Sequence, residues 1–431
     1  MSPPRKVVIV GGGFAGLSCA QKLANDERFE VTLIDRRNHH LFQPLLYQVA
    51  TAALAAPDIA RSLRGVLSRA RNVTVFLDKI TDLLPRKREI RSAKATYPYD
   101  YLVLATGART SFFGNEQWRR NTIGLKTLED AQAIRRHVLT SLEEAERSDD
   151  EDERRRLMTV AIVGAGPTGV ELAGAFSDLV RRALTSDFRR IDPSKLRILL
   201  IQSGDRILKP YQAELSEYAR RRLEDLGVEV CLGVRVDDVQ PHRVHLDNGE
   251  WIEAETVIWA AGVQATDLCT KLRCEKDNSG RFLVSPDLSL PSHPEIFAAG
   301  DIASINDAHG DPVPGLAPAA EQMGRHIAAV LKEELRLEMT RYAGRKHEFR
   351  PAFKYLDKGI MAIVGKNCAV VQAGRFKLRG FPAWCAWLFI HLLFLIGFRN
   401  KLAVLLQWAW AYIVDKPGAR VITGGAVGDS T

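Results

Sequence analysis

The chain contains Val7-Val-Ile-Val-Gly-Gly-Gly-Phe-Ala-Gly16 near its start and Val160-Ala-Ile-Val-Gly-Ala-Gly-Pro-Thr-Gly169 further on. Each stretch is an apolar run that leads into Gly-x-Gly-x-x-Gly. The first glycine of this pattern permits a tight turn, the second lets the backbone approach a pyrophosphate, and the third lets a helix pack on the strand. The sequence therefore predicts an α/β fold with two Rossmann-like domains and two dinucleotide sites. The alternative is a tight turn without a ligand.

The surroundings of the first turn favour a nucleotide site. A helix-like segment, Leu17 to Ala24, follows the turn, and a second apolar run ends in Asp35, at the expected distance. We expect Asp35 to accept hydrogen bonds from the ribose hydroxyls of an adenosine.

The second turn differs at the matching position. There the apolar run Leu196 to Gln202 ends in an amide instead of an acid, and Arg206 follows closely. A carboxylate holds a ribose 2′-hydroxyl but repels a 2′-phosphate, whereas an amide with a nearby arginine accepts one. Use of both NADH and NADPH is predicted. The alternative is that Gln202 binds only a 2′-hydroxyl and that Arg206 is a solvated charge.

Composition narrows the class of protein. A chain of 431 residues has room for two or three domains, and a net charge of +8 without a nucleic-acid motif indicates an anionic partner surface. The six cysteines show neither Cys-x-x-Cys nor metal-like spacing, which is typical of reduced, mostly buried thiols. The segment Met1 to Lys6 leads directly into a strand and leaves no room for a signal peptide. We therefore expect a cytoplasmic main body.

The chain also repeats a second design. Tyr101 to Gly107 and Val257 to Gly262 are both apolar runs that end at a glycine, and Glu143 to Arg156 is a charged helix or linker between the two halves. Glu295 to Asp301 is a further strand ending in an acid, which predicts that the chain returns to its first domain. We expect a first domain of residues 1–115 and 285–345, an inserted second domain of residues 116–284, and a C-terminal region of residues 346–431.

The C-terminal region is the most apolar part of the chain. Phe381 to Phe398 carries no charge if His391 is neutral, and the second apolar stretch, Leu402 to Val414, contains Trp408, Trp410 and Tyr412. Basic residues at 375, 377, 379, 399 and 401 flank these stretches. This pattern predicts two helices lying in a lipid interface and attracted to anionic lipid. The alternatives are a buried hairpin, a dimer interface and a membrane-spanning helix.

Together these features resemble the type II NADH:quinone oxidoreductases, which are single-chain flavoproteins. The resemblance covers nearly the whole length. Its more specific segments are His40-Leu-Phe-Gln-Pro-Leu-Leu-Tyr-Gln-Val-Ala50, Gly164 to Gly174, Gly315-Leu-Ala-Pro-Ala-Ala-Glu-Gln-Met-Gly324 and the tail after Gly380. Family members often have Ala-Gln where this chain has Ala317-Pro318, so quinone contacts at that helix start differ in detail.

The resemblance implies two sets of binding residues and no metal. The residues expected at FAD are Gly11, Gly13, Phe14, Ala15, Gly16, Asp35, Arg36, Gln43, Tyr47, Thr106, Gly107, Gly300, Asp301, Ala317, Pro318 and Ala319. The residues expected at NADH or NADPH are Gly164, Gly166, Pro167, Thr168, Gly169, Glu171, Gln202, Arg206, Ala261 and Gly262.

Three residues are expected to take part in the reaction. By resemblance Glu171 positions the nicotinamide or handles a proton, Gln322 keeps the amide of the quinone-facing helix, and Lys358 delivers a proton toward the quinone. The alternatives are that Glu171 is a carboxylate stabilised by the helix dipole and that Lys358 is a solvated surface charge.

The implied reaction is hydride transfer from the nicotinamide to the flavin, followed by two-electron reduction of a membrane quinone without proton pumping. The enzyme would lie peripherally on the cytoplasmic face of the membrane, and homodimerisation through the tail is plausible for the family. Flavin disulfide reductases and sulfide:quinone reductases share this plan, but they need paired cysteines. Cys19 has no nearby partner in the sequence, and Cys269 and Cys274 fall in a polar stretch expected at the surface. A flavin-binding signalling protein is the alternative from another class.

Overall fold

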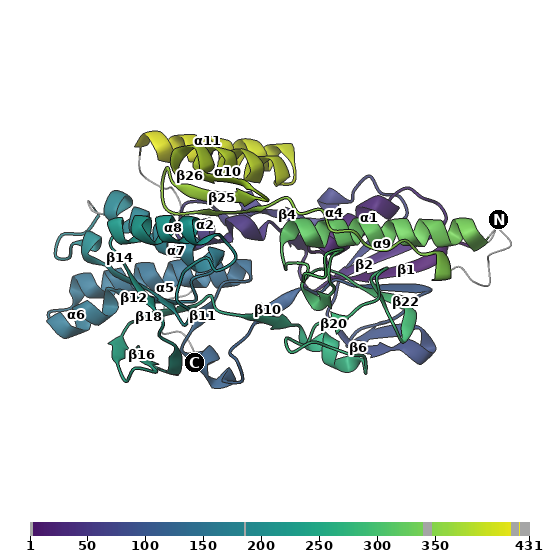
Figure 1. The fold of residues 1–431 in the computed structure, drawn as a ribbon, viewed down its shortest axis with the longest axis horizontal. Helices are drawn as coiled ribbons and strands as arrows, with labels where there is room; N and C mark the ends of the chain where they lie inside the picture. The colour runs from purple at the N-terminus through teal and green to yellow at the C-terminus, as the bar shows by residue number, and fades with distance from the viewer. Residues whose placement is uncertain (1–2, 185–186, 339–346, 415–421, 423–431) are drawn as a thin grey trace. The chain divides into compact units, whose positions relative to one another are not determined.

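The structure of the chain, a computed structural model, describes residues 3–184, 187–338, 347–414 and 422. The chain divides into two compact units, each built from separated segments (Figure 1). Unit 1 spans Met1–Leu41, Ala60–Arg109 and Val263–Lys358. Unit 2 spans Phe42–Ile59, Thr110–Gly262 and Gly359–Thr431.

Unit 1 is built on a six-stranded sheet that is parallel except at one edge. The strand order is β21 (Ser289–Leu290), β22 (His293–Ala298), β9 (Tyr101–Leu104), β1 (Arg5–Val10), β2 (Phe29–Asp35) and β5 (Val73–Leu77). Only β21 runs antiparallel to its neighbour. The expected return of the chain is confirmed, because β22 pairs in parallel with β9. Residues of both flanking helices, α1 (Phe14–Leu23) and α9 (Ala317–Glu338), are buried in this unit.

Helices α1 and α9 pack unusually closely against each other. A Cβ atom at Gly324 of α9 would overlap the backbone carbonyl of Ala15 in α1. Further elements of the unit include α4 (Leu63–Val66), the strands β3 (His39–Leu41) and β4 (Ala60–Ser62), the strand β19 (Val263–Ala265), the strands β20 (Phe282–Leu283) and β23 (Ala303–Ser304), and an antiparallel sheet of β6 (Ile80–Leu84), β7 (Glu89–Ser92) and β8 (Thr96–Pro98).

Unit 2 contains a second, five-stranded parallel sheet. Its order is β11 (Ile123–Gly124), β18 (Thr256–Trp259), β12 (Thr159–Val163), β13 (Arg197–Gln202) and β14 (Val228–Leu232). The helices of this part are α5 (Leu128–Arg147), α6 (Glu151–Leu157), α7 (Pro167–Asp178) and α8 (Ala213–Asp225), and an antiparallel sheet is formed by β15 (Val236–Gln240), β16 (Arg243–Leu246) and β17 (Trp251–Glu253). The charged stretch from Glu143 to Arg156 forms the end of α5 and most of α6.

The C-terminal region belongs to unit 2. Its described elements are β24 (Ile360–Ile363), β25 (Ala369–Ala373), β26 (Phe376–Arg379), α10 (Gly380–Phe394) and α11 (Phe398–Val414). The two short helices α2 (Leu46–Ala50) and α3 (Ala56–Ile59) lie in the same unit, with α2 against α7 and α3 against α11. Within the described residues, no helix is long and apolar enough to cross a membrane.

The unit boundaries differ from the expected domains at several points, and the C-terminal region is not a separate unit but part of unit 2 from Gly359 onward. The chain returns to unit 1 at Val263 rather than at residue 285, and residues 42–59 join unit 2 instead of the first domain. The inclusion of residues 42–59 in unit 2 is explained by packing. Leu46, Tyr47 and Val49 of α2 are buried, and this helix contacts α5 and α7 of unit 2.

Candidate functional site

The first glycine turn is held in place by contacts that exclude side chains. Gly11 has a φ of +110°, and a Cβ atom there would overlap the carbonyl of Ala105 just beyond β9. A Cβ atom at Gly16 would overlap the carbonyl oxygen of Gly11. These two glycines bring the N-terminus of α1 directly over the ends of β1 and β9, which is the geometry of a phosphate-binding turn.

Gly13 differs from these two glycines. Its φ is −71°, which any residue adopts, and a Cβ atom there would meet no atom within 4 Å. Gly13 is also the N-cap of α1, and no side chain caps the helix. The open space therefore lies beside backbone N–H groups at the positive end of a helix dipole, which fits a pyrophosphate. Phe14 and Ala15 begin the helix.

Asp35 and His40 fix Gly12 from both sides. The Oδ2 atom of Asp35 accepts from Gly12 N at 2.5 Å, and its Oδ1 accepts from Arg37 N at 2.7 Å. The buried His40 donates from Nδ1 to Gly12 O at 3.0 Å, and burial lowers the pKa of its imidazole. His40 was not predicted as a residue of this turn, because its contact with Gly12 spans 28 residues of the sequence. Arg36 is exposed beside the turn.

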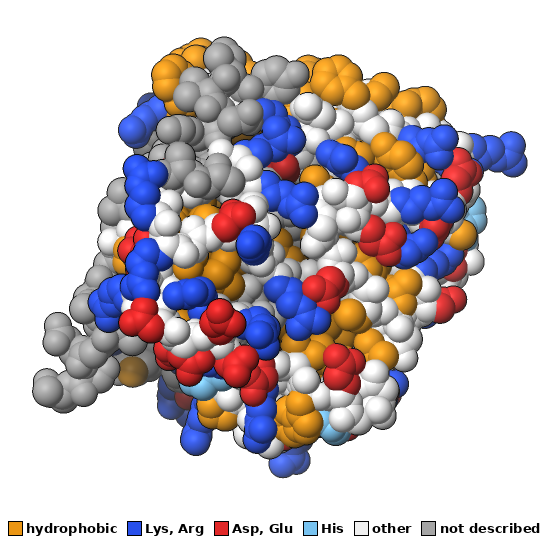
Figure 2. All heavy atoms as spheres, turned by 90° about the vertical axis from the view of Figure 1, so that its left-hand side faces the viewer, with side chains coloured by type: hydrophobic (Ala, Val, Ile, Leu, Met, Phe, Trp, Pro, Cys, Tyr) orange, Lys and Arg blue, Asp and Glu red, His pale blue; other side chains and the backbone are white. Residues whose placement is uncertain are grey.

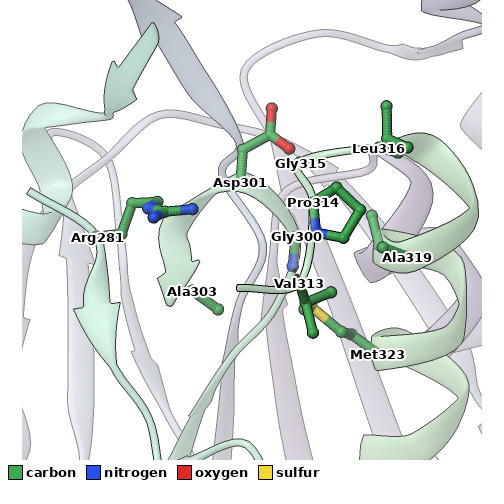
Figure 3. Close-up of a pocket in the computed structure, with 11 residues that line it drawn as sticks. Arg281, Gly300, Asp301, Ala303, Val313, Pro314, Gly315, Leu316, Ala319 and Met323 are labelled. Atoms are coloured by element: carbon green, nitrogen blue, oxygen red, sulfur yellow. Dashed lines mark hydrogen bonds between the residues drawn. The ribbon is translucent and has the colours of Figure 1, made fainter. Parts of the chain in front are cut away.

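A pocket in unit 1 surrounds Asp301. Figure 3 shows the Asp301 side chain between Arg281 and the first turn of α9. Gly300 donates from its backbone to Sδ of Met323 at 3.2 Å, which ties the short helix carrying Asp301 to α9. Of the residues expected at FAD, the pocket brings together Gly300, Asp301 and Ala319, and its other lining residues are Arg281, Ala303, Val313, Pro314, Gly315, Leu316, Ala320 and Met323.

The other residues expected at the first nucleotide lie at the ends of known elements. Thr106 follows β9, and its hydroxyl shares a 2.6 Å hydrogen bond with that of Thr266; Gly107 comes next. Ala317 and Pro318 are the first two residues of α9, where a proline is well accommodated. Gln43 and Tyr47 belong to unit 2, where Gln43 donates to the carbonyl of Lys126 at 3.1 Å.

The second glycine turn repeats the first almost contact for contact. A Cβ atom at Gly169 would overlap the carbonyl oxygen of Gly164, and one at Gly164 would press on the backbone of Ala261 beyond β18. Gly166 is open and is the uncapped N-cap of α7, and Pro167 and Thr168 are the first residues of that helix. A Cβ atom at Gly262 would overlap the ring of Phe113. The second turn therefore offers the same kind of anion site.

Gln202 occupies the place of Asp35 in this second turn. Its Oε1 accepts from Ala165 N at 2.9 Å, as Asp35 accepts from Gly12. The amide oxygen is thus bonded to the turn, and the remaining polar group is an NH₂ donor rather than a negative oxygen. Arg206 is partly exposed and donates to the carbonyl of Lys209 at 2.9 Å.

Glu171 is buried in α7, with 9% of its surface exposed. Burial raises the pKa of its carboxyl to about 8, against smaller effects of the backbone N–H of Ile363 and the indole of Trp387, which favour the charged form. The group is therefore mostly protonated at neutral pH. Its role toward the nicotinamide stays a prediction.

Gln322 and Lys358 lie on neighbouring segments of unit 1. The Gln322 amide donates to the carbonyls of Pro318 and Leu356 at 3.2 and 3.1 Å, and its oxygen accepts from Leu356 N at 2.9 Å. It thereby fixes the backbone of the segment that carries the exposed Lys358. Their roles toward a quinone stay predictions.

The six cysteines are all free. Cys19 is fully buried in α1, and burial raises its pKa to about 12. The expectation that Cys269 lies at the surface is wrong: it is the buried residue of a short 3-10 helix, Asp267–Lys271, and burial raises its pKa to about 11. Neither thiol is suited to form the thiolate that disulfide chemistry requires.

Glu171→Gln tests the buried carboxyl through stability. The folded chain raises the pKa of Glu171 from 4.5 to about 8, so between these values it keeps a proton that the unfolded chain releases, and stability falls as pH rises. An amide has no such proton. We therefore expect the urea concentration at the unfolding midpoint of the wild type to fall, relative to that of Glu171→Gln, as pH rises across this window. Glu253→Gln, at an exposed position, is the control. If the unfolding midpoints of all three chains changed with pH in the same way, the raised pKa of Glu171 would be contradicted.

Comparison with known proteins agrees with this geometry. The family model described as pyridine nucleotide-disulphide oxidoreductase matches residues 5–324. Type II NADH:quinone oxidoreductase Ndh of Mycobacterium tuberculosis is 40% identical over 435 residues, which cover 98% of this chain and 91% of that protein.

Two solved structures share the fold. NDH2 from Plasmodium falciparum in complex with NADH has a TM-score of 0.87 and 20% identity, covering 97% of this chain and 100% of that one. The sulfide:quinone oxidoreductase from Aquifex aeolicus has a TM-score of 0.70 and 19% identity, covering 92% of each chain. With its two glycine turns and its likeness to the mycobacterial enzyme over nearly the full length, the chain belongs to the pyridine nucleotide-disulphide oxidoreductase family and, within it, to the type II NADH:quinone oxidoreductases.

Proposed function

We propose that this chain is a peripheral respiratory enzyme that passes a hydride from NADH, or NADPH, to FAD and then two electrons to a membrane quinone without pumping protons. The observation that carries the proposal is the pair of open, uncapped glycine turns, one in each unit, at Gly13 and Gly166. One chain with two such turns fits a resident dinucleotide and a second one that exchanges.

The residues of unit 1 fit FAD. Gly13 leaves room for a pyrophosphate at the start of α1, and Asp35 lies at the end of β2, where it can accept from ribose hydroxyls. Asp301 in its pocket is suited to the ribityl or phosphate region. When bound, the flavin would supply the hydride and electron chemistry. The chain itself binds and orients the groups, and it needs no strong acid or base.

The alternative of a disulfide or sulfide reductase has less support. Those reactions need a reactive cysteine pair, whereas Cys19 and Cys269 are buried thiols with strongly raised pKa values. A flavin-binding signalling protein with little turnover is the remaining alternative, and it differs from an enzyme in the kinetics of flavin reduction and reoxidation.

Flavin absorbance separates these possibilities. We expect NADH to bleach the bound flavin of the purified, detergent-extracted chain rapidly and a short-chain quinone to restore the absorbance, because both half-reactions occur on one flavin. Flavin that does not bleach with either nucleotide would overturn the proposed activity. Bleaching that a quinone does not reverse would favour the signalling alternative.

Gln202 supports the use of NADPH beside NADH. Its oxygen is bonded to Ala165 N, so the group left for a ligand is an uncharged NH₂ donor, and Arg206 lies four residues further on. A 2′-phosphate would therefore not meet the repulsion that a carboxylate causes.

The substitution Gln202→Glu tests this reading. We expect the ratio of kcat/KM for NADPH to that for NADH to fall about tenfold or more, which corresponds to ~1.4 kcal/mol. The carboxylate would keep the bond to Ala165 N while repelling a phosphate. Gln240→Glu, in strand β15, serves as the matched control. An unchanged ratio in Gln202→Glu would show that Gln202 does not set nucleotide preference.

The tail helices offer a surface for lipid. Figure 2 shows hydrophobic side chains gathered over α10 and α11 at the top of the view, while charged side chains intermix below. Phe389 is 67% and Phe398 is 81% exposed. Arg375 precedes α10, Arg399 and Lys401 lie in the first turn of α11, and each basic residue near the surface adds about 1 kcal/mol of attraction to anionic lipid. We propose that this face docks on the cytoplasmic side of the membrane; a second copy of the chain is the other candidate occupant.

The double variant Phe389→Ser with Phe398→Ser tests lipid docking. We expect its affinity for vesicles rich in anionic lipid to fall about tenfold or more, because two aromatic side chains no longer enter the interface. Phe76→Ser, at an exposed phenylalanine of β5, is the matched control. Unchanged vesicle binding together with dissociation of a dimer would assign the face to a second copy instead.

A further inference from the structure

Residues from several segments of unit 2 lie near the carboxyl of Glu171 on α7. The backbone N–H of Ile363 in β24 donates to it. The phenols of Tyr47 in α2 and Tyr211 before α8 are buried near it, and its charge adds to the burial that raises both of their pKa values. Asp178 lies two turns further along α7. These neighbours leave the carboxyl in an environment with little water.

Trp387 of α10 supplies the remaining cover. Its side chain is 0% exposed, and its indole packs edge-on to Tyr47, with ring centroids 6.4 Å apart, and stacks on His391 at 4.0 Å. Burial lowers the pKa of His391 to about 4, so this ring is neutral. The indole N–H lies near the Glu171 carboxyl, but no acceptor among the described residues is aligned with it as in an ordinary hydrogen bond. Trp387 therefore acts mainly by excluding water.

Specific polar contacts seat the tail helices in this position. Trp408 of α11 donates from Nε1 to Oε1 of Gln48 at 2.8 Å, and Gln48 donates to the hydroxyl of Tyr47 at 2.9 Å. Asn400 donates to the carbonyls of Pro57 and Asp58 at 3.0 and 2.7 Å. A simple apolar anchor would need no such bonds. They fix α11 against α2 and α3, and α2 in turn lies against α7.

These contacts place the C-terminal tail in the surroundings of the proposed NAD(P)H helix. We propose that Trp387 is a positioning residue for Glu171: when α10 and α11 are seated, its indole keeps water away from the carboxyl, and when the tail is displaced, water reaches it. The inference rests on the proposed function in one respect, namely that α7 carries the turn for the nicotinamide nucleotide. The tail is then part of the environment of that nucleotide as well as a docking surface for lipid.

Infrared spectroscopy of the full chain, with its flavin and without added nucleotide, tests the proposal. The carbonyl absorption of the protonated Glu171 carboxyl is identified by its loss in Glu171→Gln and is followed over pH. The wild type should titrate near pH 8. We expect the midpoint in Trp387→Ala to fall by about one pH unit or more, because water enters. Trp387→Leu, with a smaller apolar cover, should lie between the two.

Trp387→Phe separates cover from hydrogen bonding. It keeps an aromatic cover but removes the N–H group that favours the charged form, so its midpoint should stay at or above that of the wild type. Trp251→Ala is the matched control, since Trp251 is a 40% exposed tryptophan of β17 that packs under Arg243.

A wild-type midpoint in both Trp387→Ala and Trp387→Leu would overturn the proposal, as would a Trp387→Phe midpoint as low as that of Trp387→Ala. Circular dichroism identifies a variant that does not fold. If Trp387→Ala does not fold, the midpoints of Trp387→Leu and Trp387→Phe decide whether the proposal holds. The titration uses neither NADH nor a quinone, so its outcome is independent of whether the proposed activity is found.

Discussion

The architecture depends on a close contact between two glycines, which occurs once in each unit. In each unit the third glycine of the turn rests on the carbonyl oxygen of the first glycine, at a separation that no Cβ atom would allow. This contact sets the N-terminus of α1 over the first sheet and that of α7 over the second. The small residues Ala105 and Ala261, just after β9 and β18, complete the packing because the first glycines press against their backbones. In each unit the glycine turn and the strand that leads to Ala105 or Ala261 therefore appear together in the sequence, because their backbones pack against each other.

The two turns also show how one position serves two purposes. Asp35 and Gln202 both accept from a backbone N–H of their turn, so each stabilises the turn whether or not a nucleotide is bound. They differ in what remains for a ligand: negative oxygens in one case, an NH₂ group in the other. Replacing a carboxylate by an amide can therefore change the charge presented to a nucleotide without dismantling the turn that holds it.

Local patterns predicted the parts of the structure that local chemistry determines. The glycine turns, the strands leading into them, the return of the chain at β22 and the helical tail all follow from residue types at short spacing. The burial of Trp387 and Cys269 and the membership of residues 42–59 in unit 2 did not. Burial and unit membership depend on which distant segments pack together, and the spacing of residues along one sequence does not reveal those partners. The role of His40 likewise depends on a contact with Gly12 across 28 residues.

The discontinuity of unit 1 has a consequence for biosynthesis. The second sheet is encoded without interruption between Ile123 and Trp259, so all its strands are synthesised before β22 at His293–Ala298. Until then the wholly buried strand β9 has an unpaired edge in the first sheet, and α1 lacks its partner α9. Unpaired apolar edges are sites of aggregation. The nascent chain is thus most vulnerable in the unit proposed to retain its cofactor, and that cofactor can be enclosed only after α9 has been made.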